Sequence, residues 1–308
     1  MFTRENPPTT EEVLSFHTDL SNWGRWGEED QLGTLNLLDA DARRRGAAAV
    51  RHGVSVSCAW DVPTATAAAG RDTGVQHFPP TEAHWGGVAE HVRYDCHDVA
   101  FTHLDAVSHI FWDGKIYNGR RIDDVVTTEG GLSFGSVDVA ASGLVTRGVL
   151  IDIPALRGVD WLPFGESVFP EDLDAALERQ NVTVQPGDAV LLRTGYDRIR
   201  HETEDRLSMT SGQQGWHASC LPWLRERDVA YIGCDTGQDA LPSGYESIML
   251  PVHTIGQSAM GLWLVDHCDL YELSRTAERL QQWDFLLSVS PIRFEATSGS
   301  AVNPIATF

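Results

Sequence analysis

The densest group of side chains with acid–base or metal-binding chemistry lies between residues 97 and 109. This stretch holds His97, His103, Asp105 and His109. Imidazole nitrogens and carboxylate oxygens are ligands that zinc, manganese and iron in the +2 state take from proteins, and an imidazole also transfers protons near neutral pH. The composition and spacing of the stretch therefore predict a metal site or an acid–base site.

The local backbone conformation decides how these four side chains converge. In an extended strand alternate side chains share a face, so His97, His103 and Asp105 would point the same way. His109 joins them if the strand continues, or if the chain turns helical after Asp105, because residues four apart share a helix face. Either geometry brings the imidazoles and the carboxylate to one point.

Short apolar runs rich in β-branched residues predict the strands that position this stretch. The runs 148–153, 188–195 and 229–235 (GVLIDI, DAVLLRTG and VAYIGCD) are bounded by turn residues and suit interior strands that are covered on both faces. VSVSCAWDV is expected to be a further strand, and FLLSVSPIRF is expected to be the last one.

Helices are predicted between these strands. Asp39 is a suitable N-cap for a helix through ADARRRGAAAV that ends near Gly53. PEDLDAALERQ begins with proline and two acids, and WHASCLPWLRERD can be helical if Pro222 lies near its first turn. MLPVHTIGQSAMGLWLVD is predicted to be a buried helix or a helix followed by a strand. The alternation indicates an α/β fold.

The stretch from Pro63 to about Gly87 is rich in glycine, alanine and proline and contains Trp85. It is too long for an ordinary connection between two elements. We therefore expect a loop or flap that covers a site.

Composition narrows the classes of protein to consider. The 308 residues are 42% hydrophobic and 22% charged and show neither linker nor repeat, which favours one domain over residues 1–308 with an N-terminal extension at 1–21. A net charge of −21 repels a phosphate backbone, so nucleic acid is not an expected partner.

The first residues lack an apolar core and no run approaches the roughly 18 apolar residues of a membrane helix, so we expect no membrane partner. The five scattered cysteines form no CxxC pair, which favours reduced thiols in a cytoplasmic protein.

Several segments resemble the cyclase family, which includes kynurenine formamidase and isatin hydrolase. The segment Thr102–Ala106 (THLDA) followed by His109 is similar to the family motif of a His, three residues, a second His, one residue, an Asp and a further His four positions on. NWGRWGEEDQLGTLNLL, FWDGKIYNG, RGVLIDI, VQPGDAVLLRTGY, CLPWLRERDVAYIGCDTGQDALPSG and GSAVNPIATF resemble the longer cyclase-like proteins, so the resemblance spans residues 22 to 308.

The resemblance implies a fold, a chemistry and a set of site residues. The fold would be the swivelling β/β/α domain of kynurenine formamidase-like enzymes, in a homodimer or homotetramer. Such enzymes hold one or two divalent metals, here zinc or manganese, and open amide, lactam or ester bonds of small substrates. His103 and Asp105 match the second His and the Asp ligand, and His109 matches the catalytic His. In LPVHTIGQSAMGLWLVDHCDL, His253 matches a later ligand and Asp266 stands where the family has Glu.

This sequence departs from the family motif at the first ligand. Val99 stands four residues before His103, where the family has a His, and Phe101 stands where some relatives have a second one. His97, two residues before Val99, is a candidate replacement. We therefore expect a single metal site with His97, His103, Asp105 and His253 as ligands, and His109 and Asp266 as catalytic groups.

Aromatic side chains are candidates for the walls of a substrate pocket, because their faces pack against flat rings. We predict this role for five of them: Trp60, Trp85, Phe111, Trp112 and Trp263.

The sequence thus predicts a hydrolase in which a metal-activated water attacks an acyl bond of a small cyclic or aromatic substrate and His109 transfers protons. Two alternatives stay open. One is a metal-independent cyclase or dehydratase of a biosynthetic pathway, and the other is a non-catalytic binding protein on the same fold.

Overall fold

The computed structural model describes residues 2–62, 72–78, 86–203 and 212–308, and a nine-stranded sheet forms its centre. The strand order is β1-β15-β13-β7-β9-β11-β12-β4-β14. Four neighbouring strands are parallel, and antiparallel strands flank them on both sides. The parallel strands are β7 (Leu144–Asp152), β9 (Ala189–Arg193), β11 (Tyr231–Cys234) and β12 (Trp263–Asp266). The flanking strands are β1 (Ser55–Ser57), β15 (Ile305–Thr307), β13 (Asp284–Val289), β4 (His103–Asp105) and β14 (Gly299–Ala301).

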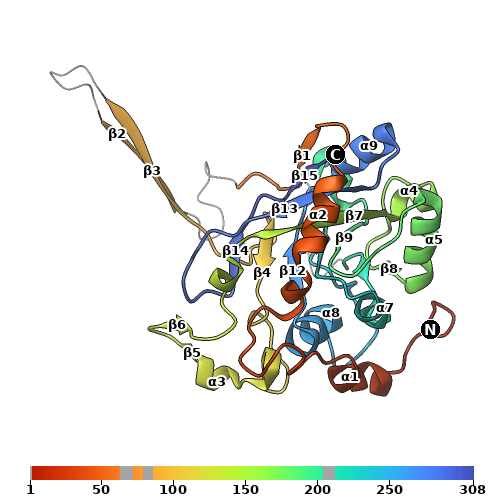
Figure 1. Ribbon diagram of the computed structural model, residues 1–308, viewed down its shortest axis with the longest axis horizontal. Helices are drawn as coiled ribbons and strands as arrows, with labels where there is room; N and C mark the ends of the chain where they lie inside the picture. The colour runs from red at the N-terminus through yellow and green to blue at the C-terminus, as the bar shows by residue number, and fades with distance from the viewer. Residues whose placement is uncertain (1, 63–71, 79–85, 204–211) are drawn as a thin grey trace.

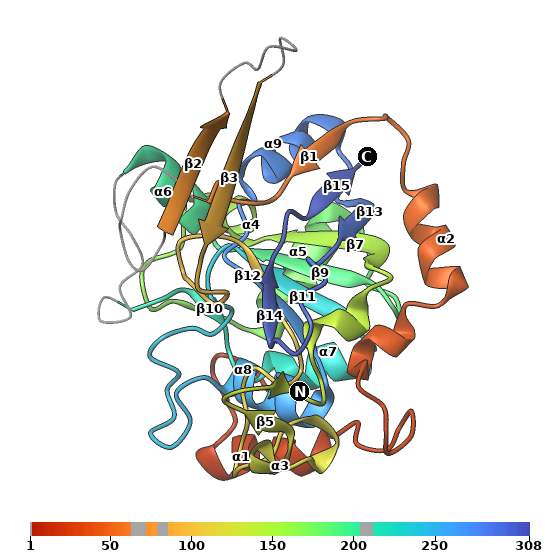
Figure 2. The same ribbon diagram turned by 90° about the vertical axis from the view of Figure 1, so that its left-hand side faces the viewer.

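The sheet is strongly curled (Figures 1 and 2). β14 lies at one end of the strand order and β15 lies next to the other end, yet only residues 302–304 separate the two strands. The backbone N–H of Val302 donates to the Thr102 carbonyl at 3.3 Å, and that of Cys58 donates to the Pro304 carbonyl at 2.8 Å. These bonds tie the two ends of the sheet together.

The core divides between the two faces of the sheet. Along β11 and β12, Ile232 and Leu264 face one cluster of buried side chains, whereas Tyr231 and Trp263 face the other. Residues of α1 (Thr10–Asp19), α5 (Pro170–Gln180), α7 (Cys220–Glu226) and α8 (Pro251–Ile255) pack into the first cluster. The second lies on the inner side of the curl and includes residues of α9 (Tyr271–Leu280).

Local sequence signals account for most of these elements. α5 has the bounds expected from its proline and acids, and Pro222 lies in the first turn of α7. Asp39 caps α2 (Ala40–Ala48), which ends earlier than the expected Gly53. The segment 249–266 contains α8, a π-helix at Gly256–Met260 and β12, as the helix-plus-strand alternative predicted. FLLSVSPIRF contains β13 but is not the last strand, because β14 and β15 follow.

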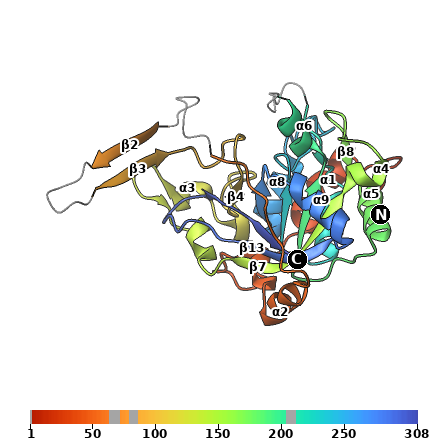
Figure 3. The same ribbon diagram turned by 90° about the horizontal axis from the view of Figure 1, so that it is seen from above.

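A two-stranded hairpin projects from the body of the molecule (Figures 1 and 3). It consists of β2 (Asp72–Phe78) and β3 (Gly87–Arg93), paired antiparallel. The expectation of a loop from residue 63 to 87 is therefore wrong for residues 72–78, which form a strand by pairing with β3. Residues 63–71 and 79–85, including Trp85, lie outside the described residues.

Smaller elements complete the chain. These are two short two-stranded sheets, β5 (Val126–Thr127) with β6 (Gly131–Leu132) and β8 (Ser167–Val168) with β10 (Gly215–Trp216); three α-helices, α3 (Ile122–Val125), α4 (Ile153–Arg157) and α6 (Tyr196–Glu202); and 3-10 turns at Gly33–Leu37, Tyr117–Gly119 and Val137–Ala140. No helix in the described part of the chain is both long and apolar enough to cross a bilayer.

Candidate metal centre

Charged side chains gather where the four parallel strands end. Asp152 and Arg193 are the last residues of β7 and β9, Asp235 follows β11, and Asp266 ends β12. Because parallel strands place their carboxyl ends at one edge of the sheet, this edge is where α/β proteins usually bind ligands. Arg193 binds Asp152 there, whereas Asp266 faces a group of histidines.

β4 brings two of the predicted residues to Asp266. It runs antiparallel to β12, and His103 lies directly opposite Asp266 in the register. Paired residues of two adjacent strands share a face, and Asp105 shares that face because it lies two residues after His103. One nitrogen or oxygen from each of His103, Asp105 and Asp266 lies within 4.8 Å of the others, and all three side chains are buried.

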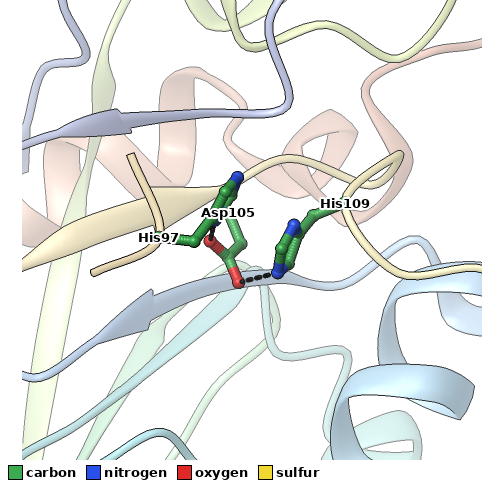
Figure 4. Close-up of side chains that lie close together, drawn as sticks. All are labelled: His97, Asp105 and His109. Atoms are coloured by element: carbon green, nitrogen blue, oxygen red, sulfur yellow. Dashed lines mark hydrogen bonds and ion pairs between the residues drawn. The ribbon is translucent and has the colours of Figure 1, made fainter. Parts of the chain in front are cut away.

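His97 contacts Asp105 from a turn and not from the predicted strand. β4 begins only at His103, and His97 belongs to the turn that precedes it. Its Nδ1 nevertheless lies 2.7 Å from Asp105 Oδ1, and its Nε2 lies 3.0 Å from Ser298 Oγ (Figure 4). A Cβ at Gly299 would come within 2.6 Å of the His97 ring, so this approach requires glycine at position 299.

His109 is placed by a turn, neither by a continued strand nor by a helix. The turn is closed by a hydrogen bond from the His109 N–H to the Ala106 carbonyl at 3.0 Å. His109 Nε2 lies 3.6 Å from Asp105 Oδ2, and its ring stacks on His97 with ring centres 3.6 Å apart. Figure 4 shows both imidazoles at the Asp105 carboxylate, with a dashed line from the carboxylate to His109. These two rings are the more exposed members of the cluster.

His253 completes the cluster from α8, with a carboxylate on each ring nitrogen. Its Nδ1 lies 2.6 Å from Asp239 Oδ2, and its Nε2 lies 3.2 Å from Asp266 Oδ2 and 3.7 Å from Asp105 Oδ2. Asp239 also accepts the backbone N–H groups of Val252 and His253 and is fully buried. Asp239 thus fixes both the start of α8 and the orientation of the His253 ring.

Gln238 orients the remaining carboxylate. Its side-chain amide donates to Asp266 Oδ1 at 2.9 Å and to the Val265 carbonyl at 3.0 Å. Its oxygen accepts the indole N–H of Trp216 at 3.0 Å, so each polar atom of this buried amide has a partner. Asp266 Oδ2 is left facing His253.

The electrostatic balance of the cluster favours anionic carboxylates. Burial alone would raise the pKa of Asp105, but the imidazoles of His109, His97 and His103 outweigh burial and hold that pKa well below its ordinary value. Burial disfavours a charged His253, but Asp266 and Asp239 outweigh it and raise its pKa well above the usual range. His109 shows the opposite balance, because burial lowers its pKa to about 4.

The donor set fits a divalent cation. Asp105 Oδ2 is buried and has no hydrogen-bond partner among the described residues, although three imidazoles and Asp266 surround this carboxylate. A buried anionic oxygen left without a donor is costly unless a cation is bound. Two overlapping groups have the spacing of metal ligands, namely His97–Asp105–His109 and His103–Asp105–Asp266. Nitrogen and carboxylate donors in this mixture suit zinc or manganese.

A match to a family model places this geometry in a known group of proteins. The model described as "Putative cyclase" matches residues 54–238, which include β4 and the turn that carries His109. The chain belongs to the cyclase family. A search of curated proteins found no match to the chain.

Solved structures show the same cyclase-family fold. A crystal structure of a novel cyclase is 23% identical, covers 95% of this chain and 99% of its own, and superposes with a TM-score of 0.83. Isatin hydrolase A from Labrenzia aggregata, bound to benzyl benzoate, is 18% identical with a TM-score of 0.53, over 84% of this chain and 94% of its own. A predicted metal-dependent hydrolase from Bacillus stearothermophilus is 13% identical with a TM-score of 0.51, over 82% and 97%. The expected fold class is confirmed.

The aromatic residues predicted to line a substrate pocket of this cyclase-family protein differ in their position relative to the histidine cluster. The Trp60 backbone N–H binds Thr102 Oγ1, beside His103, and its ring lies 3.9 Å from the Arg200 guanidinium carbon. Phe111 is half exposed, two residues beyond His109. The structure does not bring the other two described aromatics to the cluster. Trp263 is fully buried on the opposite face of β12 from Asp266 and donates to the Leu32 carbonyl, and Trp112 stacks on His17 of α1.

Three residues outside the predicted site also hold the cyclase-family site together, namely Gln238, Asp239 and Ser298. For Asp239 the available signal is its position shortly after the carboxyl end of β11, where side chains of α/β proteins often contact ligands or cap the next segment. Ser298 contacts His97 only because β14 pairs with β4, and that pairing joins segments about two hundred residues apart.

Proposed function

We propose that this cyclase-family chain is a metal-dependent hydrolase that opens an amide, lactam or ester bond of a small cyclic or aromatic compound. The observation that carries the proposal is the convergence of four imidazoles and Asp266 on the Asp105 carboxylate, whose buried Oδ2 has no hydrogen-bond partner among the described residues. A purely structural ion-pair network is expected to give a buried carboxylate oxygen a hydrogen-bond donor, because most buried polar groups in native proteins are hydrogen-bonded.

His103, Asp105 and Asp266 would hold the ion, with His253 beside them. These side chains are the most buried of the group and come from paired strands and from α8, which fixes their positions. His97 closes the more exposed side through its contact with Asp105. A bound zinc or manganese ion supplies a Lewis acid that lowers the pKa of water and polarises a carbonyl.

His109 would move the proton. It lies in a turn at the more exposed side of Asp105, and the low pKa caused by its burial keeps the ring neutral at pH 7. A neutral imidazole can accept a proton from the attacking water and return it to the leaving nitrogen or oxygen. His253 cannot take this role as readily, because carboxylates engage both of its nitrogens.

The proposed substrate class rests on the aromatic residues near the cluster and on one of the relatives. Phe111 is half exposed two residues after His109, and the Trp60 backbone is bonded to Thr102, next to His103. One of the solved structures with this fold is an isatin hydrolase, and isatin is a cyclic amide fused to an aromatic ring. A flat bicyclic compound of this kind is the first substrate to test.

A substrate panel tests the proposal directly. Purified protein would be supplied with isatin, an N-formyl aniline and a phenyl ester, and ring opening or acyl cleavage would be followed by chromatography. We expect at least one compound to be hydrolysed, the activity to disappear on chelation, and zinc or manganese to restore it. Turnover that survives complete removal of metal, or that yields a cyclised or dehydrated product, would overturn the proposal in favour of a metal-independent cyclase or dehydratase.

A further inference from the structure

Two segments that resemble the longer cyclase-like proteins lie outside the histidine cluster but pack against each other. They are NWGRWGEEDQLGTLNLL, from Asn22, and FWDGKIYNG, from Phe111. The Asn118 amide donates to the Gly27 and Asp30 carbonyls and accepts the Gly24 N–H at 2.9 Å. Two tryptophans and a lysine of these segments, Trp23, Trp112 and Lys115, take no part in this interlock.

Those three residues line a cavity of about 340 Å³. Trp23, Trp112 and Lys115 form its wall together with His17 of α1 and Ser258 of the π-helix. None of the six histidine and aspartate residues of the candidate metal centre lines it. Its volume is at the lower end of the range for small-molecule sites, so it suits a ligand with one small ring system.

On its Trp23 side the wall offers a ring but no free indole N–H. The Trp23 indole N–H is already bonded to the Ser258 carbonyl at 2.7 Å. Trp112 stacks on His17 with ring centres 4.8 Å apart and an angle of 13° between the planes. His17 Nε2 is buried and has no hydrogen-bond partner among the described residues, so the wall still holds an unused polar atom. Such a surface favours a flat apolar ring with a polar substituent.

Lys115 supplies a positive charge at the same cavity. It is the only lysine in the sequence, and it lies in a chain whose net charge is −21. The neighbouring Arg120 and Arg121 pair with Glu29 and Asp123, whereas no ion pair to Lys115 occurs within the described part of the chain. Asp113 also lines the cavity, but its side chain is exposed and water screens it.

We propose that this cavity binds a small aromatic carboxylate, with its ring against Trp23 and Trp112 and its carboxylate paired with Lys115. This second site lies outside the proposed hydrolytic centre and does not depend on it. Trp112 and Lys115 follow His109 by three and six residues, so the two sites share one segment of chain.

The single lysine makes the site directly observable. Reductive methylation with ¹³C-formaldehyde places one labelled side-chain amine in the whole protein, and Lys115→Gln identifies its NMR signal. The probes are 3-phenylpropionate, 3-phenylpropan-1-ol and 3-phenylpropylamine, which share the phenyl ring and chain length and differ in the terminal group and its charge. We expect a saturable shift of the Lys115 signal with the carboxylate, and binding about tenfold weaker for the alcohol, which cannot form the ion pair; tenfold corresponds to about 1.4 kcal/mol.

Calorimetry on protein without the methyl label compares binding by matched variants. Lys115→Gln and Trp112→Leu should each weaken binding of 3-phenylpropionate by about tenfold or more, whereas Trp161→Leu, a change at an exposed tryptophan outside the cavity, should leave it unchanged. Lys115 is partly exposed, so its variant should fold even if Trp112→Leu does not. Equal affinity for the alcohol or the amine, no saturable shift with the carboxylate, or unchanged binding in Lys115→Gln would each overturn the proposal. None of these readouts involves a metal or hydrolysis, so a failure of the proposed function leaves the test intact.

Discussion

Asp239 shows how a residue outside the predicted ligand set can control the site. A carboxylate on Nδ1 keeps a proton on that nitrogen, so the Nε2 lone pair is the one available to a metal. The 2.6 Å contact between Asp239 and His253 Nδ1 has this geometry. His253 Nε2 accordingly points at Asp266 and Asp105, the two carboxylates of the candidate centre.

We expect Asp239→Asn to weaken divalent-metal affinity by about 10- to 100-fold, the usual effect of losing a carboxylate that orients a ligating histidine. The amide offers one acceptor oxygen where the carboxylate accepts from Val252, His253 N–H and His253 Nδ1. Competition with a fluorescent chelator measures the affinity without any substrate.

Asp174→Asn is the control, because Asp174 is a partly exposed acid paired with Arg227. Affinity in Asp239→Asn equal to that in the control, in a protein that keeps its melting temperature, would show that Asp239 does not position the histidine.

His109 tests the division of roles within the cluster. If it transfers protons and is not a ligand, His109→Ala should keep the metal content and the melting temperature and lose about 10²- to 10⁴-fold in turnover. His103→Ala and Asp105→Ala should lose metal and activity together, because they remove donors from the buried group. Elemental analysis and kinetics on the same samples decide between the roles. Loss of metal in His109→Ala would make it a ligand, as the His97–Asp105–His109 group allows.

At the scale of single elements, the N-terminal segment is held by a buried histidine. Tyr245 donates to the Pro8 carbonyl at 3.1 Å, and His217 Nε2 lies 3.3 Å from the Tyr245 hydroxyl. The backbone N–H of Ser219 donates to His217 Nδ1, so the ring is neutral in this arrangement. Burial, assisted by Arg4, lowers the pKa of His217 to about 4.

This arrangement predicts a loss of stability in mild acid. Between pH 6.5 and 4, His217 is protonated in the unfolded chain but not in the folded chain. The contribution of this residue to the free energy of unfolding is therefore fully present above pH 6.5 and is lost progressively as the pH drops toward 4. The melting temperature of the parent protein should fall between pH 7.5 and pH 5, and His217→Gln should make this fall smaller by a few degrees. That difference corresponds to a loss of stability of roughly 1–2 kcal/mol caused by His217 in the parent. His52→Gln, at an exposed histidine, should leave the fall unchanged. If the melting temperature falls equally in His217→Gln and in the parent, His217 does not cause the loss of stability in acid.

Elements with strong local signals could be predicted, and those made by distant pairing could not. Proline and acids fix the start of α5, and Asp39 fixes that of α2, because capping is a short-range effect. β14 is three residues long and is a strand only because β4 lies beside it. The structure brings the predicted histidines and carboxylates together near Asp105, and their role as a metal site stays a prediction. Their backbone geometry differs from the predicted strand or helix, since turns place His97 and His109.

For the molecule as a whole, we expect about one divalent ion per chain. Asp105 belongs to both groups with metal-ligand spacing, and Val99, where the family has a His, is half exposed. One shared carboxylate limits how many ions the cluster can hold tightly. Elemental analysis after dialysis against a mild chelator measures the ratio. Two tightly held ions per chain would contradict this expectation, and none would favour metal-independent chemistry.

The curl of the sheet has a consequence for how the chain acquires its structure during synthesis. β14 and β15 come from residues 299–307, yet one borders β4 and the other separates β13 from β1. A nascent chain that has emerged only as far as β13 would therefore carry unpaired backbone groups along two different strands. Open strand edges recruit other chains. Polypeptides truncated before residue 299 should depend on chaperones and form aggregates, whereas changes confined to the projecting β2–β3 hairpin should leave this stage of maturation unaffected.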